Sequence, residues 1–263
     1  MWNFLSRDPL RSSSACYSLT KVVSSFGMYW DYWLVTLFFG IAVPILGRRR
    51  IRKLLALPDT TKSDRLRLYT STIIFQWIAA MFIYVRSGKH GLSASTLGLT
   101  YGIAWPRTAG VAILLSTLVI ANQLLSLRAL PQHPEAAKGH LQQVALKIFP
   151  RDAGERAMFF VLVVTVAVCE EFIFRGFFQP LFTALAGVSL AVGILGSAVM
   201  FGVSHLYQGR RGLITTFVIG LLFSGVTAWT GSLLPSVVAH FFTDILAGFV
   251  APRKIREALN SSG

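Results

Sequence analysis

Long runs of apolar residues restrict the fold of this chain more than any other feature of its sequence. Seven runs approach the ~20 residues that a helix needs to cross the hydrocarbon core of a bilayer, and they lie near 29–46, 68–85, 110–127, 157–178, 181–203, 213–229 and 233–250. Of the 263 residues, 54% are hydrophobic and 14% are charged, whereas about 25% of residues are charged in an average soluble domain. We therefore predict an all-α membrane protein, a bundle of about seven transmembrane helices with six to eight as the range.

The basic residues are distributed unevenly among the connections between these runs. Eighteen of the 25 Lys and Arg residues lie in the first, third and fifth connections or after the last run, and six lie before the first run or in the second connection. Because basic connections stay on the cytoplasmic side, this distribution predicts the N-terminus outside and the C-terminus in the cytoplasm. Membrane lipids are the partners that this placement of charge favours. No nucleic acid is expected, because a nucleic-acid binder carries a basic face interleaved with exposed aromatic residues.

Changes in polarity divide the chain into five segments. We expect a polar N-terminal segment at 1–28, a three-helix membrane part at 29–130, a polar connection at 131–156, a catalytic four-helix membrane core at 157–250 and a basic tail at 251–263. The first segment contains no short apolar core followed by a cleavage site, so no signal peptide is expected. The fifth run contains four glycines that allow helices to approach closely, namely Gly187, Gly193, Gly196 and Gly202.

Ionisable residues inside the apolar runs are the candidates for function, because burying such a group in a membrane costs several kcal/mol. Seven of the eleven carboxylates, Glu155 among them, are expected in loops or tails, and Asp31 lies at the edge of a run. The three that are plainly inside a run are Glu170, Glu171 and Asp244. Of five histidines, only His205 and His240 belong to runs, so the titratable groups concentrate in the fourth, fifth and seventh.

The first motif is Glu170-Glu171-Phe-Ile-Phe-Arg175. Glu171 and Arg175 are four residues apart, so on a helix they share one face and can form an ion pair. Glu170 is rotated by about 100° from Glu171 and can border the same cavity. Such a pair supplies a poised general acid or base, and the alternative is a structural Glu–Arg bridge with a spare carboxylate.

Two further motifs each contain a histidine. In the first, Phe201 lies one helical turn before His205, a residue that alone is more often interfacial or a helix cap than a catalyst. In the second, His240 and Asp244 are four residues apart, so the carboxylate could orient the imidazole, or the two could form a private hydrogen bond between helices. Together the three motifs supply a base, its tuning partner and donors for an oxyanion. No nucleophile elbow and no HExxH motif is present.

These residues resemble the pattern of the CAAX prenyl protease and bacteriocin-processing family, the Abi group of intramembrane endopeptidases. Its motifs are EExxxR, FxxxH and HxxxN or HxxxD on separate helices, and they match Glu170-Glu171…Arg175, Phe201…His205 and His240…Asp244 in order. The resemblance covers about 157–250 and implies hydrolysis of a peptide or membrane-protein substrate in a membrane-embedded cavity. The surrounding Glu-Glu-Phe-Ile-Phe-Arg-Gly-Phe is typical of bacterial members, which implies the bacterial inner (plasma) membrane.

The resemblance also implies a role for each residue. Glu170 would activate the attacking water with support from Glu171, and Arg175 would hold Glu171 in place. His205 would help to hold the water, while His240 and Asp244 would stabilise the oxyanion. Family members with prenylated substrates often have Asn where this chain has Asp244, and an Asp donates a hydrogen bond only when protonated, so it could instead orient His240.

Two questions stay open on the sequence. The first is the cofactor: the enzyme could use no metal, which we favour, or a zinc ion bound by Glu170, His205 and His240. The second is the activity itself. A non-catalytic membrane scaffold or bacteriocin self-immunity protein would keep the same fold, and a proton-coupled transporter could use the buried acids and histidines as a relay.

Overall fold

The structure is a computed structural model that describes residues 29–102, 104–130, 137–187 and 189–260. The predicted polar segment at 1–28 and the first part of the polar connection, 131–136, lie outside these residues. The described residues form helices joined by turns and irregular connections, with no β-strand among them, which confirms the predicted all-α fold. Its elements are α2 (Trp30–Leu37), η2 (Phe38–Ala42), α3 (Val43–Ala56), α4 (Lys62–Lys89), α5 (Trp105–Ala129), α7 (His140–Ile148), α8 (Ala153–Glu171), η4 (Phe172–Phe178), α9 (Gln179–Leu185), α10 (Leu190–Ser204), η5 (Leu206–Gln208), α11 (Gly209–Thr230), α12 (Leu234–Phe249) and α13 (Ala251–Asn260).

Several consecutive elements join into helices that are long and apolar enough to cross a membrane. Within the described ranges there are six of these, Trp30–Ala56, Lys62–Lys89, Trp105–Ala129, Ala153–Leu185, Leu206–Thr230 and Leu234–Asn260. The shorter α10 is also apolar. Together these helices account for the seven apolar runs, and the chain is a multi-pass membrane protein.

The boundary between the fourth and fifth runs differs from the prediction. The sequence suggested a break after 178, but the helix continues through Pro180 and ends at Leu185. Directly before this proline, Phe172–Phe178 is a π-helical segment. A wide π turn relaxes the regular hydrogen-bond ladder that a proline interrupts, which explains how the helix passes this point. Gly187 consequently lies in the turn before α10, where its positive φ of 65° suits a residue without a side chain.

The other fifth-run glycines do lie at tight helix contacts. A Cβ atom at Gly193 would collide with Thr183 and the carbonyl oxygen of Gln179, and one at Gly196 would collide with Phe182. Both collisions are with α9, so the glycines let α10 pack directly against the end of the preceding span.

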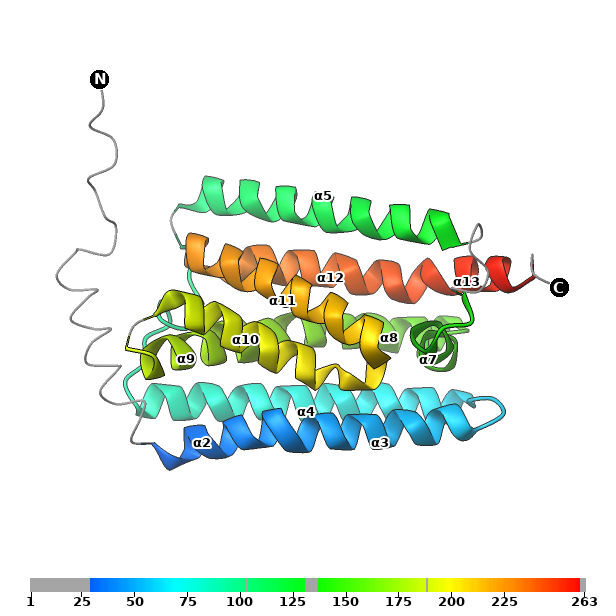
Figure 1. Cartoon of the computed structure of the whole chain (residues 1–263), viewed down its shortest axis with the longest axis horizontal. Helices are drawn as coiled ribbons and strands as arrows, with labels where there is room; N and C mark the ends of the chain where they lie inside the picture. The colour runs from blue at the N-terminus through cyan, green and yellow to red at the C-terminus, as the bar shows by residue number, and fades with distance from the viewer. Residues whose placement is uncertain (1–28, 103, 131–136, 188, 261–263) are drawn as a thin grey trace, which may run out of the picture.

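Helix α8 occupies a central position in the bundle. It packs against α4 and against α12, which in turn packs against α5, while α10 and α11 form a neighbouring pair (Figure 1). The main core lies where α8 continues into η4, and it is rich in buried phenylalanines, namely Phe39, Phe172, Phe174, Phe177, Phe178 and Phe201. Edge-to-face contacts between these rings fix their relative orientation.

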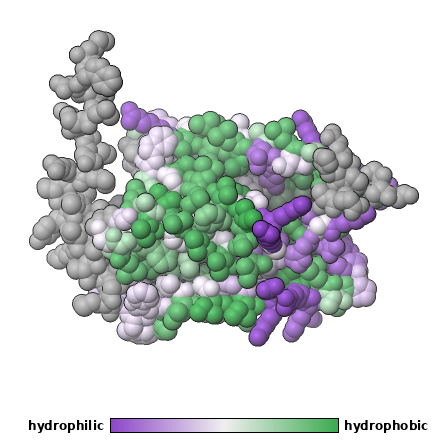
Figure 2. Space-filling model, viewed as in Figure 1, coloured by the Kyte–Doolittle hydropathy of each residue, from purple (hydrophilic) through white to green (hydrophobic). Residues whose placement is uncertain are grey.

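The outer surface has the polarity of a membrane protein. Figure 2 shows a broad hydrophobic band across the bundle and hydrophilic residues gathered at one end. Large apolar side chains are exposed along the helices, among them Ile78 and Met81 of α4 and Ile113 and Leu118 of α5. The hydrophilic end is where α3, α5 and α10 finish and where α7 and α13 lie (Figure 1). The basic connections predicted to share one side therefore do share one end of the bundle.

A buried ion pair at this basic end corrects the prediction for Glu155. Helix α8 begins at Ala153 behind an Asp152 cap, so Glu155 belongs to the helix and not to a loop. Its Oε1 accepts a hydrogen bond from Nη2 of Arg65 of α4 at 2.7 Å, and both side chains are buried. The helices continue past the ends of the apolar runs because capping residues and this ion pair satisfy the polar first turns.

Candidate active site

The two adjacent glutamates end α8 and have different surroundings. Glu171 is fully buried and accepts a hydrogen bond from Nη1 of Arg175 at 3.0 Å. The guanidinium carbon of Arg175 also lies 4.2 Å from the ring centre of Phe201. The ion pair expected from the spacing of Glu171 and Arg175 is thus present, and it is held between α8, η4 and α10.

His205 follows the last residue of α10 and caps that helix. Its Nδ1 lies 2.8 Å from the carbonyl oxygen of Phe201. A carbonyl oxygen can only accept, so Nδ1 is the donor and Nε2 is left to face the site. That Nε2 lies 3.8 Å from Oε2 of Glu170.

His240 projects from α12 towards the end of α8. Its Nδ1 lies 2.8 Å from Oε1 of Glu171, the same oxygen that accepts from Arg175. Its other nitrogen, Nε2, lies 3.6 Å from Oδ2 of Asp244. Glu171 is therefore the carboxylate that directly orients this imidazole, and Asp244 is the more distant of the two.

Gln76 of α4 is a site residue that the sequence motifs did not indicate. Its Nε2 donates to Oε1 of Glu170 at 2.9 Å, and the side chain is buried. The second oxygen of Glu170, Oε2, has no hydrogen-bond partner among the described residues. A signal for Gln76 existed, because it is the only carboxamide in the predicted second span. Such a polar group in an apolar span needs a partner.

The exposure of the side chains shows on which side the cluster is open. Glu171 is fully buried, Glu170, His205 and His240 are nearly so, and the side chain of Asp244 is 31% exposed. The cluster is therefore open beside Asp244. A separate, largely apolar cavity of about 510 Å³ reaches the other side of α8, where it is lined by Cys169, Phe172 and Trp77. These residues adjoin Glu170, Glu171 and Gln76 in the sequence.

We tested whether the cluster fits the zinc ion considered as an alternative. In the part of the chain that the structure describes, no three His, Cys, Asp or Glu side chains are arranged so that they could hold a metal ion. The described residues as placed do not fit a zinc site.

The protein-family comparison decides the relationship of this segment to known proteins. Residues 152–246 match the family model described as Rce1-like, type II CAAX prenyl endopeptidase. Over this segment the chain is similar to the Rce1-like family. The Rce1-like segment contains all three motifs, from Glu170 to Asp244, whereas Gln76 lies outside it. Comparisons with curated proteins and with solved structures gave no significant match.

The Rce1-like family is a family of proteases, and this agrees with the resemblance drawn from the three motifs. The match over 152–246 and the six long apolar helices of the described residues together support a multi-pass membrane protein that is similar to a protease family over this segment.

Proposed function

We propose that this chain is an intramembrane endopeptidase that hydrolyses peptide bonds with a water molecule activated by Glu170. One observation carries the proposal. Within a segment similar to a protease family, Glu170 has one oxygen fixed by Gln76 and the other without a hydrogen-bond partner among the described residues, next to two histidines from two other helices. A carboxylate with one free oxygen in a sheltered site is suited to accept a proton from water.

The reaction can be written with these side chains. A water between Oε2 of Glu170 and Nε2 of His205 gives a proton to Glu170 as its oxygen adds to the carbonyl carbon of the peptide. The resulting oxyanion accepts a hydrogen bond from a protonated Nε2 of His240. The carbon–nitrogen bond then breaks, and the leaving amine takes the proton from Glu170. General base catalysis and oxyanion stabilisation of this kind each contribute about 10²-fold or more.

The remaining residues are proposed to position these groups. Glu171 accepts from both Arg175 and His240, so it sets the direction in which His240 points. Asp244 lies at the open side of the cluster, where it can interact with Nε2 of His240 or with the substrate. We propose a positioning role for Arg175 and Phe201 as well, because they pack against each other beside Glu171.

We further propose that the substrate is a peptide or membrane-protein segment and that the chain resides in a bacterial inner membrane. The substrate proposal rests on the family, whose description names CAAX prenyl endopeptidases. The location rests on the sequence around the first motif, from Glu170 to Phe177. A prenylated CAAX peptide and its unprenylated form are therefore the first defined substrates to compare.

The test is cleavage of these peptides and of a peptide library by the purified full chain in detergent. Glu170→Ala and His240→Ala are each expected to lower kcat by about 10²-fold or more, with and without a strong zinc chelator. Glu257→Ala is the matched control, since this carboxylate pairs with Lys254 in the exposed end of α13. Activity that the chelator abolishes and zinc restores would overturn the metal-free mechanism. No cleavage of any peptide by the unaltered chain would favour a scaffold or transporter.

A further inference from the structure

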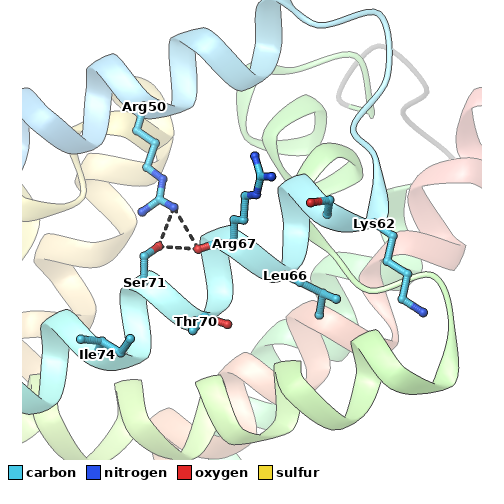
Figure 3. Close-up of a pocket in the computed structure, with 8 residues that line it drawn as sticks. Arg50, Lys62, Leu66, Arg67, Thr70, Ser71 and Ile74 are labelled. Atoms are coloured by element: carbon cyan, nitrogen blue, oxygen red, sulfur yellow. Dashed lines mark hydrogen bonds between the residues drawn. The ribbon is translucent and has the colours of Figure 1, made fainter.

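A groove lies on the outer face of the bundle at its basic end, away from the glutamates. It has a volume of about 840 Å³ and runs along α4 beside α3 (Figure 3). Arg50 of α3 reaches across to α4, which contributes Ser63, Arg67, Thr70, Ser71 and Ile74 to the lining. These residues of α4 recur every three or four positions, so they form one stripe along the helix.

Arg50 is fixed in place by the helix that it faces. Its Nη2 donates to Oγ of Ser71 at 2.6 Å and to the carbonyl oxygen of Arg67 at 3.3 Å (Figure 3). Both bonds use one nitrogen, so the other donors of the guanidinium have no protein acceptor among the described residues. A guanidinium that is already oriented loses little conformational freedom when it binds an anion.

The charge of the groove is positive and largely uncompensated. No acidic residue lines it, and neither Arg50 nor Arg67 forms an ion pair within the described ranges. Only Lys62, at one end, is paired, with Asp152 at 2.9 Å. Two unpaired guanidinium groups beside hydroxyl groups form a site that suits a phosphate group.

The polarity along α4 changes at the groove. Ser63, Arg67 and Ser71 are exposed at the basic end, and beyond them Ile74, Ile78 and Met81 are exposed in the apolar band. A ligand lying along this stripe meets positive charge first and hydrocarbon-facing side chains next. This order matches a molecule with an anionic head and an apolar tail.

We propose that this groove binds an anionic phospholipid, with its phosphate between Arg50 and Arg67 and one acyl chain along Ile74. The hydroxyl groups of Thr70 and Ser71 are close enough to the arginines to meet the glycerol and ester oxygens. The proposal is independent of the protease activity, because the groove shares no residue with the glutamate cluster.

The test measures binding of single lipids to the full chain in detergent by native mass spectrometry. Phosphatidylglycerol is the anionic probe and phosphatidylcholine the zwitterionic one. The unaltered chain is expected to prefer phosphatidylglycerol, and the pair Arg50→Gln with Arg67→Gln is expected to weaken its Kd by about tenfold to thirtyfold. Arg48→Gln with Arg52→Gln is the matched control, because it removes two exposed charges from α3 outside the groove.

Several outcomes would overturn the proposal. An equal loss in both double variants would mean diffuse attraction to a basic surface, and an unaltered chain without preference would mean that no site exists. Tight binding of sn-glycerol 3-phosphate, which lacks acyl chains, would assign the groove to a soluble phosphate. If the glutamine pair does not fold, Arg50→Lys with Arg67→Lys replaces it; it keeps the charge and loses the guanidinium contacts, so a severalfold loss is expected and full retention contradicts the contacts.

Discussion

Glu170 and Glu171 are adjacent in sequence and face different neighbours. Consecutive residues of a helix are about 100° apart, so Glu171 points towards His240 of α12 while Glu170 points towards Gln76 of α4. One oxygen of Glu171 accepts hydrogen bonds from Arg175 and His240, whereas Oε2 of Glu170 has no hydrogen-bond partner among the described residues. In the proposed mechanism these two identical side chains therefore have separate tasks, orientation of His240 for Glu171 and proton transfer for Glu170.

Gln76 provides a sharp test of how Glu170 is positioned. Replacing Gln76 with Leu removes the donor at 2.9 Å from Oε1 and leaves the carboxylate free to rotate. A hydrogen bond to a charged group is worth about 1.5 kcal/mol or more, so we expect kcat to fall about tenfold while KM changes little. Steady-state cleavage kinetics of the two proteins measure both constants.

Gln179→Leu is the matched control for Gln76→Leu. Gln179 is also a buried amide that joins two helices, donating to the carbonyl oxygen of Ser224 at 3.1 Å. The Gln179→Leu substitution should lower the thermal stability of the chain without the tenfold loss of kcat. If both variants lose kcat to the same extent, Gln76 has only a structural role.

Helix boundaries show where reasoning from the sequence succeeds and where it fails. The seven apolar runs predicted the order of the apolar helices, because apolar length marks a helix that can span a bilayer. Among the described residues six helices are long enough to do so, and the fifth run forms the shorter α10. The predicted ends of these helices were less accurate. The fourth run was predicted to end at 178, yet the π-helical segment Phe172–Phe178 lets the helix continue through Pro180, and nothing in the local sequence signals such a turn.

The contact between α10 and α9 gives a test at the glycine that it depends on. An alanine at Gly193 would place its Cβ against Thr183 and the carbonyl oxygen of Gln179, so the helices must separate. We expect Gly193→Ala to destabilise the fold by about 1–3 kcal/mol, seen as a lower midpoint of thermal unfolding in detergent.

Gly110→Ala is the control for this substitution. Gly110 also lies within a helix, but no atom lies within 4 Å of the Cβ that an alanine would add. The midpoint of thermal unfolding of the Gly110→Ala variant should stay the same or rise, because alanine favours the helix more than glycine does. Equal losses at the two positions would show that helix packing is not the cause.

The bundle has one strongly basic end, and its orientation in the membrane is a further prediction. The positive-inside rule puts this end in the cytoplasm. A cysteine introduced at Ser93, in the exposed connection after α4, should react with a membrane-impermeant maleimide in intact cells, in a chain with both native cysteines replaced by serine. A cysteine at Asn260, at the end of α13, should react only after permeabilisation. The reverse pattern would mean that the topology is inverted.

The motifs indicated most of the candidate site, and the limits of that prediction have a physical cause. Residues on one helix, such as Glu171 and Arg175, can be paired from their spacing. The contact of His240 with Glu171 could not be foreseen, because it depends on how α8 and α12 rotate against each other. Gln76 was missed for a related reason, since it carries no charge and comes from a helix outside the three motifs.

The hydrogen bond from Gln76 to Glu170 also means that the candidate site extends beyond the segment that matches the family model. Residues 152–246 carry the family motifs, yet one oxygen of Glu170 is held by a helix that precedes them by many residues. Under the proposed mechanism, residues 152–246 therefore do not contain the whole active site. A chimera that transplants residues 152–246 into another membrane scaffold must bring α4 along or supply an equivalent donor to Glu170.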